Sequence, residues 1–492
     1  PMNFRRRQRK GPRILAALLC ATLLAVGGKL WWEQTTTTVT GLVVDAETQQ
    51  PVPNVQVRWE GLATVTDAQG RYTLTGVDRD RPDAQLVFAT GDHQTLQVPV
   101  AEAGQAARLV LDDAATGVIQ DQSRRPVANA RITAGNTTGA TDEQGTFRLK
   151  GLPANPQLRV VAPGYKPVTV RPGAHRQLVV TLEPFTPRGI YIGFGAVATK
   201  DIREEWLRHV ERLNLNTVVL DVTSDRGQVL PGVDTELTRQ ADAVLEGSDD
   251  LAAMVRDLRN RNLYVVARMV VFKDNPVSLL RPEWTIKQTA NGAPYVDCEG
   301  QRWLDPFKEA VWEYKVSLAE RAAELGFNEV QFDYVRFPSD CIGGQLAYSR
   351  PLSDETKRTA IEGFLKLASQ RLRDRGVAVG ADVFGLVATE DDIGIGQHLE
   401  TLGQYVDYLC PMVYPSTWAN GAFNIDYPPA DPYGVVYQSV KSAVGRLGKQ
   451  GAIVRPWLQA FDDYSRQRLP YGNQQIADQI KAAETAGATG WM

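Results

Sequence analysis

The sequence predicts a multidomain protein: an N-terminal membrane anchor helix, two small β-sandwiches, and a C-terminal α/β domain of the (β/α)8 TIM-barrel class. Three observations support this prediction. A basic segment precedes an apolar run near the N-terminus, a strand-rich pattern occurs twice, and the last three fifths of the chain alternate strands with amphipathic helices. At 492 residues the chain is also too long for one ordinary domain.

The composition excludes several classes of function. The net charge is −3, so the chain lacks the basic excess that nucleic-acid partners favour. The four histidines, at positions 93, 175, 209 and 398, are scattered, whereas zinc hydrolases take two or three histidines at close spacing. We therefore expect no nucleic-acid partner, no metal and no cofactor. A metal-dependent deacetylase is disfavoured for the same reason.

The N-terminal segment predicts the compartment. Residues 1–13 contain the basic string RRRQRK and read as a cytoplasmic flank, and residues 14–32 read as a signal-anchor transmembrane helix that ends in two tryptophans. A cleaved signal peptide is the alternative, because the apolar core at 14–28 is short. With the basic side inside, the rest of the chain is expected outside the cytoplasm, in a periplasmic or extracellular location, on a single-pass membrane protein.

Residues 39–112 and 113–184 form a repeat, in which Asp67 and Asp142, for example, match at an offset of 75 residues. Each copy alternates short strands with D-x-x-G turns, a pattern typical of small β-sandwiches. The pattern G-x-V-x-D…P-V-x-N-x-x-V, followed by T-D-x-x-G-x-[YF]-x-L-x-G, resembles the carboxypeptidase regulatory-like domain family. That resemblance implies an immunoglobulin-like sandwich. A spacer role is favoured over carbohydrate binding, since Trp59 is the only tryptophan in the two copies.

Residues 188–492 predict the barrel. Amphipathic stretches such as DIREEWLRHVERLN separate eight candidate strands. Eight parallel strands with intervening helices match the strand count of a (β/α)8 barrel. The candidate strands are 190–196, 217–222, 263–272, 329–334, 377–385, 405–414, 452–460 and 489–492. Because a full barrel needs a further helix after its eighth strand, we expect the C-terminus of this domain to be truncated.

The string EVQFDYVRFPSD places polar residues where the fourth strand ends. In a (β/α)8 barrel the active site lies at the carboxyl ends of the strands, so Asp333 is expected to face the mouth. An ionised carboxylate beside apolar strands must be paired or hydrogen-bonded, and Arg336 is the expected partner. Tyr334 adds an aromatic ring at the same place.

Other predicted strands also carry polar or aromatic residues near their carboxyl ends. Paired carboxylates on neighbouring strands suit glycosidic bond cleavage, and aromatic faces stack on sugar rings. We predict Asp333 and Asp382 as catalytic residues. The expected substrate-binding residues are Asp221, Arg268, Lys273, Tyr334, Arg336, Tyr414, Trp418, Arg455, Trp457 and Gln459.

Structural roles remain open for several of these residues. Asp221 could cap the loop that follows it, and Asp382 could be a carboxylate buried against Arg268. Arg455 and Trp457 are as well suited to packing as to ligand binding. Lys273 could belong to a solvated loop face.

The cysteines fit an exported protein without requiring one. Cys298 and Cys341 both fall in polar loops and could form a disulfide outside the cytoplasm, whereas Cys410 reads as a small core residue.

The barrel region resembles a family of glycosyl hydrolases catalogued as a domain of unknown function and related to barrels of the α-amylase type. The strings that carry the resemblance are NTVVLDVTSDRG, VVARMVVFKD, CPMVYPS, PWLQAF and, most specifically, FDYVRFP. It implies a barrel glycosidase with Asp333 as nucleophile and Asp382 as candidate acid/base. Related barrels more often have Glu at the latter position, which weakens that assignment.

These predictions combine into one hypothesis: a membrane-anchored extracytoplasmic glycoside hydrolase that acts on a polysaccharide through two carboxylates. The rival hypothesis is a non-catalytic carbohydrate-binding or scaffolding protein on a degenerate barrel. Dependence of turnover on Asp333 would separate the two.

Overall fold

The computed structural model describes residues 36–492, except 46–48, 79, 82–83, 91–92, 102–107, 112–113, 153–155, 173–176 and 449–450. The predicted anchor at 14–32 lies outside the described residues. Within them, no helix has the length and apolar character needed to cross a membrane. The chain divides into two compact units, the first containing residues up to 115 and the second containing most of the rest.

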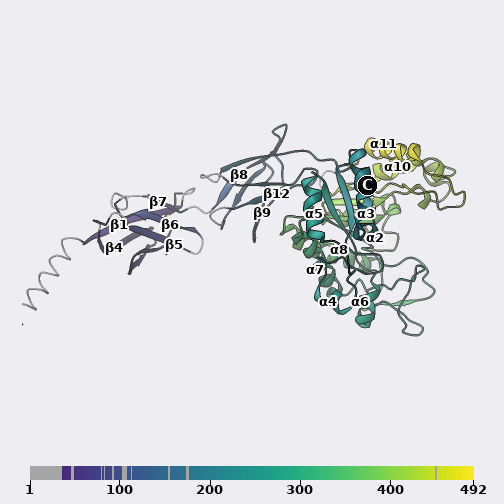
Figure 1. The fold of residues 1–492 in the computed structure, drawn as a ribbon, viewed down its shortest axis with the longest axis horizontal. Helices are drawn as coiled ribbons and strands as arrows, with labels where there is room; N and C mark the ends of the chain where they lie inside the picture. The colour runs from purple at the N-terminus through teal and green to yellow at the C-terminus, as the bar shows by residue number, and fades with distance from the viewer. Residues whose placement is uncertain are drawn as a thin grey trace, which may run out of the picture. The chain divides into compact units, whose positions relative to one another are not determined.

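The first β-sandwich consists of two sheets with the strand orders β4-β1-β7 and β3-β2-β5-β6 (Figure 1). Its core contains Val39, Val57, Tyr72, Leu86 and Phe88, which are all buried. The strands are β1 Thr36–Asp45, β2 Gln56–Trp59, β3 Leu62–Val65, β4 Arg71–Asp78, β5 Gln85–Thr90, β6 His93–Pro99 and β7 Arg108–Leu111.

The second β-sandwich repeats this architecture strand for strand, with the orders β11-β8-β14 and β10-β9-β12-β13. The internal repeat read from the sequence is therefore a repeat of structure. The strands are β8 Ala115–Asp121, β9 Arg131–Ala134, β10 Thr137–Ala140, β11 Thr146–Leu149, β12 Leu158–Val161, β13 Val168–Val170 and β14 Gln177–Leu182.

The D-x-x-G turns of the two copies have the same physical basis. Asp67 accepts hydrogen bonds from the backbone N–H groups of residues 69 and 71, and Asp142 accepts the equivalent bonds from residues 144 and 146. Gly70 and Gly145 then adopt positive φ angles of 69° and 71°, a conformation that favours glycine. The repeated Asp and Gly are thus required by one turn geometry.

The C-terminal region forms a curled parallel sheet with the order β15-β16-β17-β19-β21-β22-β23 among the described residues. Each of the first seven predicted strands corresponds to one of these strands. They are β15 Gly189–Ile192, β16 Thr217–Asp221, β17 Tyr264–Val270, β19 Glu329–Asp333, β21 Ala378–Phe384, β22 Tyr408–Met412 and β23 Ile453–Val454.

Residues 489–492, predicted as the eighth strand, connect the two edges of this sheet. Thr489 and Met492 donate backbone hydrogen bonds to Val454 and Pro456, next to β23. Trp491 donates to Pro187 and accepts from Gly189, beside and within β15. The segment makes a single parallel bridge, between Trp491 and Arg188, rather than a full strand.

Helices connect successive strands of the sheet (Figure 1). The apolar faces of these helices pack on the strands, and the buried residues of helices and sheet share one large core. The helices are α2 Phe194–Ala198, α3 Lys200–Arg212, α4 Glu236–Gln240, α5 Leu251–Asn260, α6 Asn275–Leu280, α7 Glu309–Glu324, α8 Asp354–Arg373, α9 Leu399–Leu402, α10 Pro432–Leu447 and α11 Asn473–Thr485. A short antiparallel pair, β18 Lys287–Gln288 and β20 Leu346–Ala347, links two loops beyond the carboxyl ends of β17 and β19.

The second β-sandwich packs on the amino-terminal end of the curled sheet, within the same compact unit. Arg131 forms two hydrogen bonds of 2.8 and 2.9 Å with Asp407, the residue before β22. Burial would raise the pKa of Asp407, but the charges of Arg131 and Arg373 lower it below its usual value. The backbone N–H of Gly164 also donates to the Tyr408 hydroxyl at 3.1 Å. This sandwich is therefore attached directly to the sheet.

Candidate active site

Four charged residues lie at or near the carboxyl ends of neighbouring parallel strands. Asp221 ends β16, Arg268 lies near the end of β17, Asp333 ends β19 and Asp382 lies on β21. The register pairs Asp221 with Arg268, and Val270 with Asp333. Because these strands are parallel and side chains alternate between the two faces, the four side chains meet on one side of the sheet. The sequence predicted all four.

Arg268 is the centre of this group. Its Nε donates to Asp333 Oδ2 at 3.0 Å, and its Nη2 donates to the same oxygen. Its Nη1 donates to Asp221 Oδ1 at 2.6 Å. Asp225 and Asp382 lie at 3.6 and 3.8 Å from the guanidinium. One buried arginine thus faces four carboxyl groups, and its own charge is strongly retained because burial is outweighed by Asp333 and Asp221, which raise its pKa.

Asp382 differs from Asp333 in its surroundings. Its Oδ1 accepts a 2.7 Å hydrogen bond from the indole N–H of Trp457, while its Oδ2 has no hydrogen-bond partner among the described residues. Burial, followed by the nearby charge of Asp333, raises the pKa of Asp382 well above its usual value. Asp382 is therefore poised to hold a proton on the unpartnered oxygen, beside a carboxylate that accepts hydrogen bonds on both of its oxygens.

Asp221 forms the third side of the cluster. Its Oδ2 accepts hydrogen bonds from the Tyr191 hydroxyl and, at 3.2 Å, from the backbone N–H of Phe194. Burial raises the pKa of Asp221, and Arg268 opposes this shift. Tyr191 was not predicted as a site residue. Its position on the first strand, just before the G-F-G turn, is the signal that could have identified it.

Tyr334 connects the carboxylates to a second polar group. Its backbone N–H donates to Asp333 Oδ1 at 2.6 Å, and its φ of 50° lies in the left-handed region. Such a conformation costs about 1 kcal/mol or more in a non-glycine residue and is often found at functional sites. The ammonium group of Lys273 lies 4.3 Å from the centre of the Tyr334 ring.

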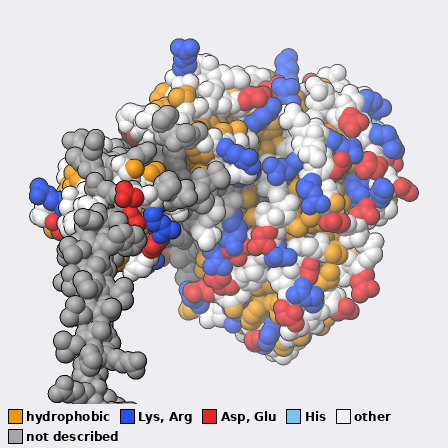
Figure 2. Space-filling model, turned by 60° about the vertical axis from the view of Figure 1, so that its left-hand side comes forward, with side chains coloured by type: hydrophobic (Ala, Val, Ile, Leu, Met, Phe, Trp, Pro, Cys, Tyr) orange, Lys and Arg blue, Asp and Glu red, His pale blue; other side chains and the backbone are white. Residues whose placement is uncertain are grey.

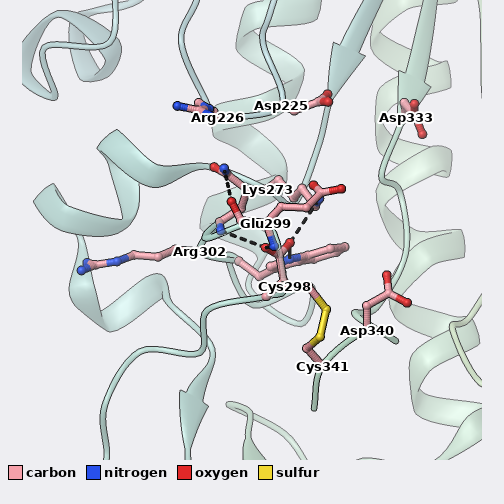
Figure 3. A network of polar contacts seen from close by, with 12 residues as sticks. Asp225, Arg226, Lys273, Cys298, Glu299, Arg302, Asp333, Asp340 and Cys341 are labelled. Carbon is pink, nitrogen blue, oxygen red and sulfur yellow. Dashed lines mark hydrogen bonds and ion pairs between the residues drawn. A yellow bond between two sulfur atoms is a disulfide. The ribbon is translucent and has the colours of Figure 1, made fainter. Parts of the chain in front are cut away.

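The ammonium group of Lys273 is held by the carboxylates of Asp297 and Glu299 (Figure 3). Its Nζ lies 2.7 Å from Glu299 and 3.1 Å from Asp297. Asp297 also accepts the indole N–H of Trp303 at 3.0 Å. Lys273 is thus a buried residue in an organised loop rather than part of a solvated loop face.

The expected pairing of Arg336 with Asp333 is wrong, because Arg268 takes that position. Arg336 instead donates to the carbonyl of Phe337 and to Ser339, and lies 3.5 Å from Asp340. Its guanidinium stacks 5.1 Å from the centre of the Trp303 ring. It therefore orders the loop after β19, next to Tyr334.

Cys298 and Cys341 form a disulfide, with their Cα atoms 5.5 Å apart (Figure 3). It joins the loop that carries Asp297 and Glu299 to the loop that carries Arg336 and Asp340. Cys410 is free and buried, as the sequence predicted.

Three predicted substrate-binding residues lie away from the carboxylate cluster. Arg455 has no exposed surface and pairs with Glu329 at the beginning of β19, about 13 Å along the strand from Asp333. Gln459 is fully buried and its side chain bonds to Ser416 and to the Phe461 carbonyl. Trp418 packs in the core against Phe423. The contacts of Arg455 and Trp418 are those of structural residues, whereas Gln459 also lines the cavity described next.

Tyr414 and Trp457 line a cavity of about 710 Å³ together with Tyr191. Burial, and then the charges of Asp333 and Asp382, raise the pKa of Tyr414, so its hydroxyl stays protonated near the two carboxyl groups. Phe461, which also lines this cavity, stacks on Tyr464 with ring centres 6.0 Å apart. Both rings are half exposed and were not predicted; their position just beyond β23 was the available signal.

Among the described residues, no group of three or more His, Cys, Asp or Glu side chains is arranged to hold a metal ion. What the geometry offers is a carboxyl group held by Arg268 beside a buried carboxyl group whose pKa is raised, with tyrosines at the rim. This combination suits general acid chemistry coupled to nucleophilic or electrostatic stabilisation.

Residues 189–492 match the family described as "Putative glycosyl hydrolase domain". The chain belongs to this family. Residues 114–183 match the carboxypeptidase regulatory-like domain. Both resemblances drawn from the sequence motifs are thereby confirmed. No curated protein matches the chain.

Several solved structures are similar to this chain. A hypothetical protein from Ruminiclostridium thermocellum is 30% identical, covering 39% of this chain and 97% of that one, with a TM-score of 0.33. The glycoside hydrolase domain of PgaB (BpsB) from Bordetella bronchiseptica is 16% identical, covering 63% and 94%, with a TM-score of 0.47. An α-galactosidase from Thermus thermophilus is 14% identical, covering 73% and 72%, with a TM-score of 0.40.

Proposed function

We propose that this protein is a glycoside hydrolase that cleaves a polysaccharide, with Asp333 as the nucleophile and Asp382 as the acid/base. The observation that supports this most directly is the contrast between the two carboxyl groups. Both are buried, but Asp333 accepts hydrogen bonds from Arg268 and from the backbone, whereas Asp382 has a raised pKa and one oxygen without a hydrogen-bond partner among the described residues. Two carboxyl groups whose surroundings favour different protonation states are what acid-assisted glycosidic cleavage needs.

In the first step, a carboxylate oxygen of Asp333 attacks the anomeric carbon while Asp382 gives its proton to the leaving glycosidic oxygen. The C–O bond to the leaving sugar breaks, and a glycosyl ester with Asp333 forms. In the second step, Asp382 takes a proton from water, whose oxygen attacks the same carbon and releases Asp333. Arg268 remains charged throughout and holds Asp333 in place.

The proposed mechanism is retaining. Inverting enzymes keep their carboxyl groups about 6.5–9.5 Å apart, to leave room for a water, and retaining enzymes about 5–5.5 Å apart. Asp333 Oδ2 and Asp382 Oδ2 approach the same nitrogen, Arg268 Nε, at 3.0 and 3.8 Å. These two oxygens therefore lie at most about 6.8 Å apart, near the lower limit of the inverting range, which supports a retaining mechanism.

We also propose the extracytoplasmic, membrane-anchored placement predicted from residues 1–32. Beyond the basic and apolar N-terminal pattern, the Cys298–Cys341 disulfide supports it, since disulfides persist mainly in oxidising compartments. Fractionation of cells that produce the full chain, with protease added to intact cells, tests this placement. Recovery of the full chain in the soluble cytoplasmic fraction would contradict it.

The test of activity is release of reducing ends by the full chain from a panel of bacterial and plant polysaccharides. Asp333→Asn should lose more than about 10³-fold in rate, as expected for removal of a covalent catalyst. Asp382→Asn should lose a similar factor on substrates with poor leaving groups and much less on aryl glycosides, which need little acid assistance. Asp257→Asn is the control, because it removes an exposed carboxylate from α5.

A thermal melt of each variant separates loss of chemistry from loss of fold. Equal activity of Asp333→Asn and wild type would disprove the nucleophile role. Binding of a polysaccharide without any cleavage by wild type would favour the non-catalytic carbohydrate-binding hypothesis.

A further inference from the structure

Around the candidate active site the cationic side chains are buried, whereas several of their carboxylate partners are exposed. Three cations pair with carboxylates here, and the exposed fractions of their side chains are only 9% for Arg268, 4% for Lys273 and 10% for Arg336. One carboxylate partner of each is open to solvent: 49% of Asp225, 64% of Glu299 and 66% of Asp340. A ligand that approaches from solvent therefore meets carboxylates, with the cations behind them.

Neighbouring arginines do not reverse this arrangement. Arg226 and Arg302 are close in sequence to Asp225 and to Glu299, but Figure 3 shows both side chains pointing away from Asp333. Asp225, in contrast, points toward the side of Asp333 in the same view. The charge presented toward the catalytic carboxylates is therefore negative.

Asp225 lies 3.6 Å from the Arg268 nitrogen that also binds Asp333, and Glu299 lies 2.7 Å from Lys273, whose ammonium group is 4.3 Å from the centre of the Tyr334 ring. The phenol of Tyr334 has its pKa raised to about 12 by burial and then by Asp333, Asp225 and Glu299, with Lys273 opposing. The backbone of the same residue donates to Asp333. The exposed carboxylates thus border the place where the reacting sugar or its neighbour would lie.

A second observation indicates that the cluster receives a ligand. Asp382 Oδ2 is buried, faces Arg268 Nε at 3.8 Å and has no hydrogen-bond partner within the described part of the chain. A buried polar atom without a partner is costly, and a hydrogen-bonding group supplied by a ligand would satisfy it. Four carboxyl groups around one arginine also leave this centre short of positive charge and donors.

We propose that the substrate is a polysaccharide that carries free, protonated amino groups, that is, a hexosamine polymer with unacetylated units. A protonated amine donates charge-assisted hydrogen bonds to carboxylates such as Asp225 and Glu299. A uronic acid at the same place would be repelled, and an N-acetyl group would offer no charge. This inference rests on the proposed glycosidase function and adds the chemical class of the sugar.

The experiment compares matched polymers. Each amino-sugar polysaccharide of the panel, chitin oligosaccharides included, is used before and after chemical N-deacetylation, so that the linkage stays constant. Cellulose oligosaccharides and polygalacturonate serve as the neutral and anionic polymers. Both reducing-end release and equilibrium binding are measured with the full chain, at low and at moderate salt.

Deacetylated polymers should bind at least tenfold more tightly than their acetylated counterparts, and salt should reduce the difference because it screens exposed charges. The preference should also fade as the pH rises and the amines lose their protons. The double variant Asp225→Asn/Glu299→Gln should lose most of the preference. The matched control is Glu204→Gln/Asp257→Asn, which removes two carboxylates that pair with Arg261 on outer helices.

Cleavage or binding of acetylated, neutral or anionic polymers at least as strong as that of deacetylated ones would overturn the proposed substrate class while leaving the glycosidase function intact. Tight, salt-sensitive binding of deacetylated polymers without cleavage would support the recognition and contradict the catalytic function. If no polymer is bound or cleaved by a correctly folded chain, both proposals fail.

Discussion

Arg268 donates to a single carboxylate oxygen of Asp333 through both Nε and Nη2, while its remaining nitrogen reaches Asp221. This geometry depends on the planar fork of guanidinium, which lysine lacks. The position of Asp333 therefore depends on an arginine of the neighbouring strand β17, together with the backbone N–H of Tyr334, and not on the side chain of Arg336.

Arg268→Lys should lower kcat by about 10²-fold or more, because an ammonium group lacks the planar fork through which Arg268 binds Asp333 twice and Asp221 once in a fixed geometry. The control is Arg261→Lys, since Arg261 also faces three carboxylates but is partly exposed on the outer helices. Steady-state kinetics on the best substrate of the panel would decide. A kcat within a factor of two of wild type in Arg268→Lys would contradict the positioning role.

Trp457→Phe should shift the alkaline limb of the pH–rate profile to higher pH. The indole N–H of Trp457 stabilises the charged form of Asp382, which opposes the effect of burial on its pKa. Without that donor the pKa of Asp382 rises further, so the acid form persists to higher pH. Trp312→Phe, which removes an indole hydrogen bond from α7 to the Pro306 carbonyl, should leave the limb in place. An unchanged or downward-shifted limb in Trp457→Phe would count against Asp382 as the acid.

Asp382 should also affect stability. In the unfolded chain an aspartate titrates near about 3.9, whereas burial raises the pKa of Asp382 in the folded state. Between those two pKa values the folded state binds one more proton at Asp382 than the unfolded state. The stability that this proton contributes is complete below the unfolded pKa and is lost as the pH rises through the folded pKa. The melting temperature of Asp382→Asn relative to wild type should therefore increase with pH over this window. A difference that does not change with pH would contradict the raised pKa.

Arg131→Ala should destabilise the unit that contains the second sandwich and the sheet by about 3 kcal/mol, because it leaves the buried Asp407 carboxylate with fewer partners. Lys166→Ala removes an ion pair between exposed groups and should cost less than about 1 kcal/mol. Urea unfolding of the full chain, followed by tryptophan fluorescence, measures both. Equal midpoints for the two variants would show that the contact contributes little.

The double variant Cys298→Ser/Cys341→Ser should lose about 3–4 kcal/mol of stability, as expected from closing a loop of this length. It should also raise KM more than it lowers kcat, because the disulfide orders the loops of Glu299 and Asp340 rather than the catalytic carboxylates. Reducing agent should reproduce the effect in wild type and add nothing in the double variant. An unaltered KM would mean that these loops do not contact substrate.

The order of strands could be predicted from the sequence because buried parallel strands leave continuous apolar runs, as in TVVLD and YVVARMV. The position of Asp333, Asp382, Asp221 and Arg268 followed from the rule that strand ends converge. The partner of Asp333 could not be predicted. Arg336 is three residues away and Arg268 sixty-five, and only the register of β17 beside β19 brings the distant arginine closer.

Inward and outward residues near strand ends were also hard to separate by sequence. Arg455 and Trp457 are two residues apart just after β23, yet Trp457 reaches Asp382 and Arg455 pairs with Glu329 at the beginning of β19. The prediction that both side chains face the same side of the sheet was correct. Their positions along the chain direction differ, and only Trp457 lies beside the carboxylate cluster. Tyr191 and the stacked Phe461 and Tyr464 were missed because no charge marks them in the sequence.

The sandwich contacts have a mechanical consequence. Arg131 and Gly164 hold residues at the start of β22, whereas the carboxylates occupy the opposite ends of the neighbouring strands. The sandwich contact and the candidate active site thus lie at opposite ends of the same parallel sheet. If the substrate is the proposed polysaccharide, a long chain can cross the carboxyl ends of the strands without meeting the sandwich, and a pull on that chain would be transmitted along the strands to the sandwich.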